Sequence, residues 1–340
     1  MHELTVCKFG GSSLADADCF RRVRDIIRAD RRRRYIIVSA PGKSAGDSAK
    51  MTDMLIRAHT VPNERPQLLA HIRRKYTAIA GELSIAVPQD ALDSLEAAAA
   101  HSRDAIASRG EHINARQLSE YAGLPFIEAA DVIIFREGSL DVPATYRNLR
   151  NIGPCGVIPG FYGSDGAGSI VTFPRGGSDI SAAHVAAALG ADLYENWTDV
   201  DGFFTADPAL VNDARLIECM NWEQARLFAC LGAEVLHYDS ISPAAEAGIP
   251  ILVRNTFRPD GRGTMICADG NCPMPCITCR ALASSKYLIS ALNLTPAMQI
   301  KAQEILNGGT EHGGMVCAEC EAEELAQLTG RLHRALLALA

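Results

Sequence analysis

The stretch LTVCKFGGSSLADADCFRRVRDIIRADRRRRYIIVSA, residues 4–40, decides the fold class of this chain. Its apolar run at residues 4–9 is typical of a buried strand, and apolar residues at helical spacing follow in residues 16–28. A second strand, rich in isoleucine and valine, is expected at residues 35–40. The order strand, helix, strand predicts a parallel sheet that is covered by helices.

The same alternation of short apolar runs with helical patterns continues beyond this stretch. We expect helices at residues 52–60, 65–81, 89–107, 111–122, 178–189, 223–231 and 240–247. We expect strands at residues 126–128, 132–135, 157–161, 169–173, 191–198 and 249–253.

The character of the chain changes where glycine, proline and cysteine gather between residues 269 and 279. This composition predicts a linker at residues 267–282 that follows a large α/β domain at residues 1–266. Beyond it, residues 283–340 read as a small α+β unit with the order strand, helix, strand, helix.

Composition and charge exclude several classes of protein. Of 340 residues, 48% are apolar and 21% are charged, which is typical of a folded globular chain. The net charge of −7 argues against nucleic acid as a partner, because nucleic-acid binding requires a basic face. The chain starts without an apolar signal core and has no run long enough to span a bilayer. With eleven cysteines, an odd number, these features predict a cytoplasmic protein with reduced thiols and no membrane partner.

The first motif with chemical meaning is Lys8-Phe9-Gly10-Gly11-Ser12-Ser13, where the first strand ends. Two glycines let the backbone approach a phosphate closely, and lysine supplies a compact positive charge. By itself, however, this motif is more often a tight turn with a solvated lysine.

The second motif is Arg175-Gly176-Gly177-Ser178-Asp179, between an expected strand and an expected helix. The N-terminus of a helix attracts anions, and the planar guanidinium of arginine matches a carboxylate. Asp179 alone would be an ordinary helix cap, but a cap does not require the preceding Arg-Gly-Gly, so a functional role is favoured.

Two further motifs carry acidic groups. Thr198-Asp199 stands at the end of an expected strand, where open α/β sheets bind nucleotides, although an Asp-Gly turn at residues 201–202 explains it equally well. Glu111, which follows Gly110 at a helix start, suits an ammonium group or simply the helix dipole.

Taken together, the motifs resemble one family, the aspartate kinases of the amino-acid kinase superfamily, over residues 4–266. The order and spacing of the whole set are more specific than any single motif. The matching segments are Lys8–Ser13, Ser39-Ala40, Thr52-Asp53, Gly110-Glu111, Arg175–Asp179, Thr198–Gly202, Ala206-Asp207-Pro208, Gly232–His237, Arg254-Asn255-Thr256 and Gly263-Thr264.

The resemblance implies a three-layer α/β/α sandwich with a mainly parallel central sheet and the transfer of phosphate from ATP, with Mg²⁺, to the side-chain carboxylate of L-aspartate. Lys8 and Asp179 would be the catalytic residues, and no protein metal ligands are implied. The ATP-binding residues would be Lys8, Phe9, Gly10, Gly11, Thr198, Asp199, Phe204 and Glu234. The aspartate-binding residues would be Ser39, Thr52, Glu111, Arg175, Gly176, Gly177 and Ser178.

The chain departs from the family pattern at its nucleotide residues and at its C-terminal end. Many relatives have tyrosine, arginine and lysine where Phe204, Ala209 and Glu234 stand, which bears on ATP affinity more than on reaction type. The family usually carries two ACT modules that sense lysine or threonine, whereas residues 283–340 fit one reduced ACT-like unit. We therefore expect weak feedback. The family also implies a homodimer and a product that enters lysine, threonine and methionine biosynthesis.

Three alternatives stay open from the sequence. The chain could be a kinase of the same superfamily with a different acceptor, or a non-catalytic regulatory homologue. The spacing of the pairs Cys276/Cys279 and Cys317/Cys320, with Cys272 nearby, also permits a zinc site, although a cysteine-rich linker is the more frequent explanation.

Overall fold

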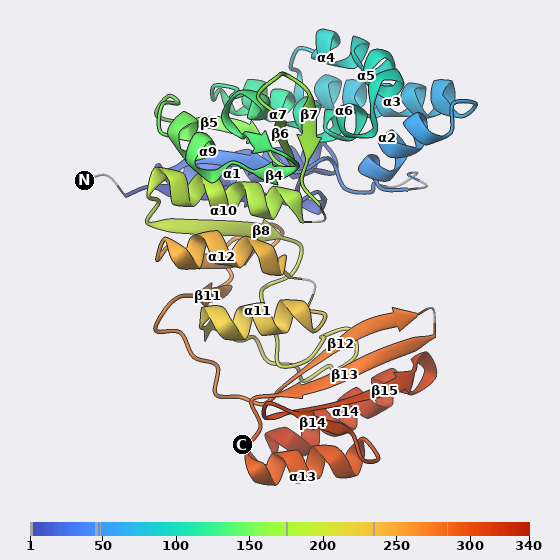
Figure 1. Ribbon diagram of the computed structural model, residues 1–340, viewed down its shortest axis with the longest axis vertical. Helices are drawn as coiled ribbons and strands as arrows, with labels where there is room; N and C mark the ends of the chain where they lie inside the picture. The colour runs from blue at the N-terminus through green and yellow to red at the C-terminus, as the bar shows by residue number, and fades with distance from the viewer. Residues whose placement is uncertain (1–2, 45–46, 48, 175, 234, 284) are drawn as a thin grey trace. The chain divides into compact units, whose positions relative to one another are not determined.

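The computed structural model describes residues 3–340 except 45–46, 48, 175, 234 and 284. Its contacts divide the chain into two compact units, which are traced in Figure 1. Unit 1 comprises Met1–Asp199 and Asp239–Gly261, and unit 2 comprises Val200–Tyr238 and Arg262–Ala340. The predicted catalytic domain at residues 1–266 therefore contributes to both units, and its boundaries remain a prediction.

Unit 1 is built on a parallel sheet with the strand order β5-β2-β1-β8-β10. All residues of β1 are buried, which is expected for a central parallel strand that is covered on both faces. The bounds of these strands are β1 Thr5–Phe9, β2 Arg33–Val38, β5 Gly156–Pro159, β8 Leu193–Thr198 and β10 Ile251–Asn255.

The alternation of side chains along β1 assigns its residues to two faces. Cys7 and Phe9 join a core with Phe20 of α1 (Ala17–Ala29) and Leu118 of α7 (Arg109–Ala122). Lys8 points to the opposite face, where α10 (Gly177–Leu189) contacts β1 and lies beside β8 in Figure 1. Helices therefore cover both faces of the sheet, and the predicted α/β/α fold is confirmed.

The remaining elements in this part of the chain surround the sheet. They are η1 Ser12–Leu14, α2 Met51–Thr60, α3 Arg65–Leu83, α4 Gln89–Asp93, α5 Leu95–His101, α6 Arg103–Ala107, α8 Ala129–Val132, β3 Phe135–Arg136, β4 Ser139–Leu140, α9 Val142–Leu149, β6 Tyr162–Ser164, β7 Ile170–Thr172 and α12 Tyr238–Glu246.

Some local predictions were wrong. The helix expected at residues 89–107 is divided into α4, α5 and α6. Ser102 separates α5 from α6, because it adopts an extended conformation and caps α6 through the N–H of Ala105. The strand expected at residues 132–135 starts later and is shorter than predicted: Val132 is the last residue of α8, Ile134 forms a single bridge with Ser164, and Phe135 begins β3. The strand expected at residues 126–128 is reduced to a single bridge between Phe126 and Val157. At Ser102 the local side-chain cap outweighs the apolar pattern.

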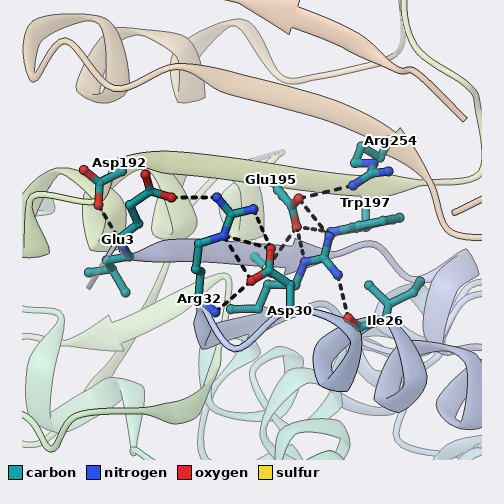
Figure 2. Close-up of polar contacts among 11 residues, drawn as sticks. Glu3, Ile26, Asp30, Arg32, Asp192, Glu195, Trp197 and Arg254 are labelled. Atoms are coloured by element: carbon teal, nitrogen blue, oxygen red, sulfur yellow. Dashed lines mark hydrogen bonds and ion pairs between the residues drawn. The ribbon is translucent and has the colours of Figure 1, made fainter. Parts of the chain in front are cut away.

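A buried charge network on Glu195 of β8 joins the strands of unit 1 (Figure 2). Arg33 Nε of β2 lies 2.7 Å from Glu195 Oε2, and the two side chains are only 7% and 4% exposed. Trp197 Nε1 donates to the same carboxylate at 3.0 Å, and Arg254 Nη1 of β10 lies 3.4 Å from Glu195 Oε1. Arg33 also donates to the carbonyl of Ile26 at 2.6 Å. The network connects β2, β8, β10 and α1.

Replacing Glu195 by glutamine is expected to lower the free energy of unfolding by about 3–5 kcal/mol, because it leaves the buried Arg33 without its counter-charge. Urea denaturation measures this change. The matched control is Glu218→Gln, which breaks an ion pair with Arg262 whose side chains are 62% and 78% exposed and should change stability little. An effect no larger than that of the control would contradict the prediction.

Unit 2 combines a short parallel pair of strands with a separate antiparallel sheet. The parallel pair is β9 (Cys219–Met220) with β11 (Thr264–Ile266), and α11 (Trp222–Cys230) follows β9. The antiparallel sheet has the order β12-β13-β15-β14 and packs against α13 and α14 through a common apolar core. The bounds are β12 Cys276–Ala283, β13 Lys286–Leu292, α13 Pro296–Ile305, β14 Thr310–His312, β15 Met315–Glu321 and α14 Ala322–Leu337.

Most of β12 lies inside the segment that the sequence predicted to be a linker, residues 267–282. The linker prediction is therefore wrong from Cys276 onward. Residues of β12 pair with β13 from Cys276 opposite Leu292 to Ala283 opposite Lys286, and this long-range pairing is invisible in the local composition. No helix in the described part of the chain is long and apolar enough to cross a membrane.

Candidate active site

A cavity of 680 Å³ lies in unit 1. Its lining draws on segments that are far apart in the sequence, including β1, α2, α7 and α10. Of the residues that the sequence predicted to be functional, those that line this cavity are Lys8, Ser39, Thr52, Glu111, Gly176, Gly177, Ser178 and Asp179. The tertiary structure therefore brings most of the predicted catalytic and aspartate-binding residues together in one place.

An ion pair between Lys8 and Asp179 lies at the wall of this cavity. Lys8 Nζ is 2.7 Å from Asp179 Oδ1, and the two side chains are 10% and 14% exposed. The pair forms because Lys8 occupies the α10-facing side of β1 while Asp179 is in the first turn of α10. Asn196 Nδ2 also donates to Asp179 Oδ1, at 3.1 Å. The carboxylate therefore holds the ammonium group of Lys8 in a fixed position.

The N-terminus of α10 is shaped by two glycines. Gly176 has a φ of 75°, a conformation that a residue with a Cβ adopts only with strain. A Cβ on Gly177 would lie 2.7 Å from a ring carbon of Phe161. This turn places the first N–H groups of a helix at the cavity, and such groups favour an anionic ligand. Arg175, which precedes them, lies outside the described residues.

Glu111 supplies a buried carboxylate from the first turn of α7. It is 4% exposed, and its Oε2 atom has no hydrogen-bond partner among the described residues. Burial raises the pKa of Glu111 to about 8, although backbone N–H groups at Ala40 and Glu111 partly offset the rise. A buried carboxylate with an unpartnered oxygen is costly to ionise, so this position favours a cationic ligand group.

A second hydrogen-bond network holds the helix turn that carries Glu111. The neighbouring His112 Nδ1 lies 3.0 Å from Glu128 Oε2, and the Tyr162 hydroxyl donates to Glu128 Oε1 at 2.6 Å. Burial alone would raise the pKa of Glu128, but the contacts with His112 and Tyr162 lower it to about 2. Glu128 thus stays ionised at neutral pH and anchors α7, while Tyr76 donates from α3 to the carbonyl of Gly110.

The glycine turn after β1 packs against the loop after β2. The Gly42 N–H donates to the Gly11 carbonyl at 2.7 Å, and a Cβ on Gly11 would lie 2.9 Å from the Ala40 carbonyl oxygen. The Gly10 N–H donates to the carbonyl of Trp197 on β8. The turn therefore lies at the carboxyl ends of neighbouring parallel strands, where open α/β sheets bind their ligands.

A model of the amino acid kinase family matches residues 3–255 of this chain. The chain belongs to this family. It is 32% identical over 287 residues to aspartokinase 3 of Bacillus subtilis, an alignment that covers 77% of this chain and 63% of the relative. The chain thus spans less than two thirds of the length of that relative.

Solved structures agree with this assignment. The aspartate kinase of Clostridium acetobutylicum is 27% identical with a TM-score of 0.85, and the alignment covers 98% of this chain and 100% of that one. Aspartokinase III of Escherichia coli, solved in complex with aspartate and ADP, is 27% identical with a TM-score of 0.73 and coverage of 94% and 79%. The predicted resemblance to aspartate kinases is confirmed.

Not all of the predicted nucleotide residues of this chain line the first cavity. The Phe9 side chain is fully buried in the core and stacks on Trp197 with ring centroids 5.9 Å apart, so only its backbone is available to a ligand. Thr198 and Asp199 follow β8, and the Thr198 hydroxyl donates to Asp199 Oδ1 at 3.2 Å. Phe204 lines a different cavity, within unit 2, and Glu234 lies outside the described residues.

The sequence contains no indication of several residues that line the first cavity. Lys50, Arg103 and Phe161 lie in its wall, and none of them belongs to a recognisable motif. Asp53 also lines the cavity, and its position after Thr52 at the start of α2 was the one available signal.

The zinc alternative gains no support from the cysteines of unit 2. Cys272 Sγ and Cys276 Sγ are 3.8 Å apart, but Cys279 contacts the Thr329 hydroxyl and Cys317 contacts the Ser290 hydroxyl. Among the described residues, no group of three or more histidine, cysteine, aspartate or glutamate side chains is arranged to hold a metal ion.

Proposed function

We propose that this protein transfers the γ-phosphoryl group of ATP to the side-chain carboxylate of L-aspartate, which yields 4-phospho-L-aspartate. The observation that carries the proposal is the buried Glu111 carboxylate, whose Oε2 has no hydrogen-bond partner within the described part of the chain, in the cavity that Lys8 and Asp179 also line. A cavity with an ammonium-binding carboxylate at one position and a phosphate-binding lysine at another suits an amino acid as the acceptor of phosphate.

The acceptor is held through both of its charged backbone groups in this proposal. The α-ammonium group of aspartate binds Glu111, and the α-carboxylate binds the helix N-terminus at Gly177 and Ser178 together with Arg175. Thr52, Gly176 and Ser39 complete the acceptor site. Such two-point binding positions the side-chain carboxylate for reaction.

The chemistry requires no covalent intermediate, because a carboxylate is already ionised and nucleophilic at neutral pH. Lys8 neutralises charge on the transferred group, and Asp179 orients Lys8. Gly10 and Gly11 bind phosphate oxygens through their N–H groups, with Thr198, Asp199 and the backbone of Phe9 near the nucleotide. In unit 2, Phe204 and Glu234 are proposed to bind ATP.

Magnesium is proposed to arrive with ATP. Mg²⁺ retains several water ligands and binds mainly through phosphate oxygens and one or two carboxylates, so it needs no preformed cage of protein ligands. Bound Mg²⁺ would neutralise phosphate charge during transfer.

The decisive experiment traps the acyl phosphate with hydroxylamine. The protein, ATP and Mg²⁺ are incubated with aspartate, and in parallel with glutamate, N-acetylglutamate, carbamate or UMP. Aspartyl hydroxamate with aspartate alone is expected. A product with another acceptor would identify a different kinase of the family, and no product from folded protein with any acceptor would indicate a non-catalytic homologue.

Feedback control is expected to be weak. Between Cys276 and Leu337 the chain forms one small unit, the sheet β12-β13-β15-β14 with α13 and α14, and we propose that this unit by itself responds only weakly to lysine or threonine. Millimolar lysine or threonine should leave the hydroxamate rate near its uninhibited value. A fall to a small fraction of that rate at millimolar lysine would contradict this prediction.

The cellular location, the oligomeric state and the fate of the product are also part of the proposal. We expect a cytoplasmic homodimer whose product enters lysine, threonine and methionine biosynthesis. Light scattering of the purified chain tests the dimer directly.

A further inference from the structure

A second cavity, of 490 Å³, lies entirely within unit 2. One part of its wall is the segment from Val200 to Pro208, which includes Phe204, and another part is Gly232, Ala233 and Val235. The remaining wall comes from the C-terminal sheet, through residues 277–281 of β12 and Tyr287 of β13.

The strand β12 is fixed firmly to the first of these segments. The Ile277 N–H donates to the carbonyl of Thr205 at 2.8 Å. The Thr205 hydroxyl in turn contacts His333 Nε2 of α14 at 2.9 Å, and both of these side chains are almost fully buried. The C-terminal sheet is therefore a structural part of this wall.

The segment at Gly232 also packs directly on β12. Gly232 has a φ of +107°, and a Cβ there would lie 2.6 Å from the Cys279 carbonyl oxygen and 2.8 Å from Arg280 Cβ. The backbone of Gly232 packs directly against β12, so a residue with a Cβ would not fit at this position. The cavity wall is continuous at this point.

Alternation along β12 divides its side chains between two faces. Ile277 and Cys279 pack into the core that α13 and α14 form. Thr278 and Arg280 share the opposite face, about 7 Å apart along the strand. Thr278 is 5% exposed, yet its hydroxyl has no hydrogen-bond partner among the described residues, which is uncommon for a buried polar atom.

Arg280 is the positive charge of this cavity. It is exposed at the rim, where its Nη1 atom lies 3.4 Å from the carbonyl of Cys230. Among the described lining residues it is the only cation, and Asp207 is the only acid. The half-buried rings of Phe204 and Tyr287 also line the cavity. Aromatic faces stack on nucleobases, and guanidinium groups bind phosphates.

We propose that Thr278 and Arg280 of the C-terminal sheet bind the nucleotide. Arg280 binds a phosphate oxygen, and the Thr278 hydroxyl binds a polar atom of the ribose or base. This inference rests on the proposed function for the identity of the nucleotide as ATP. It gives two residues of β12 a role in nucleotide binding within unit 2, whereas the sequence placed both of them in a linker at residues 267–282.

The test is calorimetric titration with ADP in the absence of aspartate. Arg280→Gln is expected to raise the Kd for ADP about ten-fold or more, because a charge-assisted hydrogen bond is lost. Arg280→Lys should recover part of the affinity. The control Arg262→Gln changes an arginine of the same unit that is 78% exposed and does not line the cavity, and it should leave the Kd unchanged.

A second variant removes the Thr278 hydroxyl and keeps the shape of the side chain. Thr278→Val should raise the Kd for ADP several-fold if the hydroxyl binds nucleotide. If the hydroxyl is only a buried polar atom, Thr278→Val will instead stabilise the protein to heat and leave the Kd unchanged, which overturns its role. An unchanged Kd in Arg280→Gln overturns the role of the guanidinium.

Different results would refute the proposed function and the present inference about Thr278 and Arg280. Wild-type protein that binds ADP, with the expected loss in Arg280→Gln, but forms no aspartyl hydroxamate would refute the proposed function and support the present inference. Wild-type protein that binds neither ADP nor ATP would refute the inference. In active protein, Arg280→Gln should raise the KM for ATP and leave the KM for aspartate unchanged.

Discussion

Replacing Lys8 by methionine is expected to lower kcat for aspartyl hydroxamate formation by roughly 10³-fold. The ammonium group lies 2.7 Å from Asp179 at the cavity wall, and methionine fills the same space without charge. Because charge neutralisation matters most in the transition state, kcat should fall far more than the KM for either substrate rises. Steady-state kinetics with each substrate varied in turn measures both effects.

Two further variants keep the Lys8 prediction testable if the methionine variant folds poorly. The double variant Lys8→Met/Asp179→Asn removes both charges of the ion pair and should fold, yet it should remain inactive. Lys301→Met removes an exposed lysine of α13 and serves as the matched control with full activity. If the folded double variant keeps activity within ten-fold of wild type, Lys8 takes no part in phosphate transfer.

Replacing Glu111 by glutamine is expected to eliminate measurable aspartate binding while it leaves ADP binding intact. The neutral amide cannot compensate the α-ammonium group of the substrate in a site where Glu111 is 4% exposed. Glu120→Gln, on the exposed side of the same helix, is the matched control and should bind aspartate normally. Saturable aspartate binding of wild-type strength by Glu111→Gln would refute the assignment.

The raised pKa of Glu111 gives wild-type aspartate binding a pH dependence of defined sign. With a pKa of about 8, the free carboxyl is mostly protonated at pH 7, and the substrate ammonium must displace that proton. The KM for aspartate should therefore fall as the pH rises toward 8 and level off above it, by up to about ten-fold per pH unit. The KM for ATP should lack this trend. A flat profile for aspartate below pH 8 would contradict the burial argument.

The raised pKa of Glu111 also predicts that the stability of the folded protein depends on pH. The folded state binds the Glu111 proton more tightly than the unfolded chain, whose glutamate has a pKa of 4.5. The contribution to stability is therefore fully present below pH 4.5 and is lost as the pH rises through about 8. In Glu111→Gln this loss should be absent, so the variant should gain stability relative to wild type between these pH values. Thermal unfolding at several pH values measures the difference.

The main fold was predictable because its signal is local. The apolar run of β1, the helical spacing of α1 and the glycine after α7 each belong to one short segment, and the structure contains all three elements. β12 could not be found in this way, because its stability depends on pairing with β13 and on the core that α13 and α14 complete. Composition around Cys276 indicates only a break in the preceding pattern.

The candidate site shows the same division. Lys8 and Asp179 were assigned from motifs that are 171 positions apart in the numbering, and they meet because β1 directs alternate side chains to the α10 face. Lys50 and Arg103 carry no motif, so their place in the cavity wall could come only from the folded chain.

By itself, the sequence determined the parallel α/β class of this protein, the family that its motifs resemble and the residue types of its candidate site. Only the tertiary structure decided that the Glu111 carboxylate is buried, with one oxygen that lacks a partner among the residues that the structure describes. It also decided that β12 brings Thr278 and Arg280 to the cavity beside Phe204. The physical reason is that motif and periodicity are properties of neighbouring residues. Burial, and therefore the pKa of a carboxyl group or the cost of an unpaired hydroxyl, depends on atoms that distant segments supply.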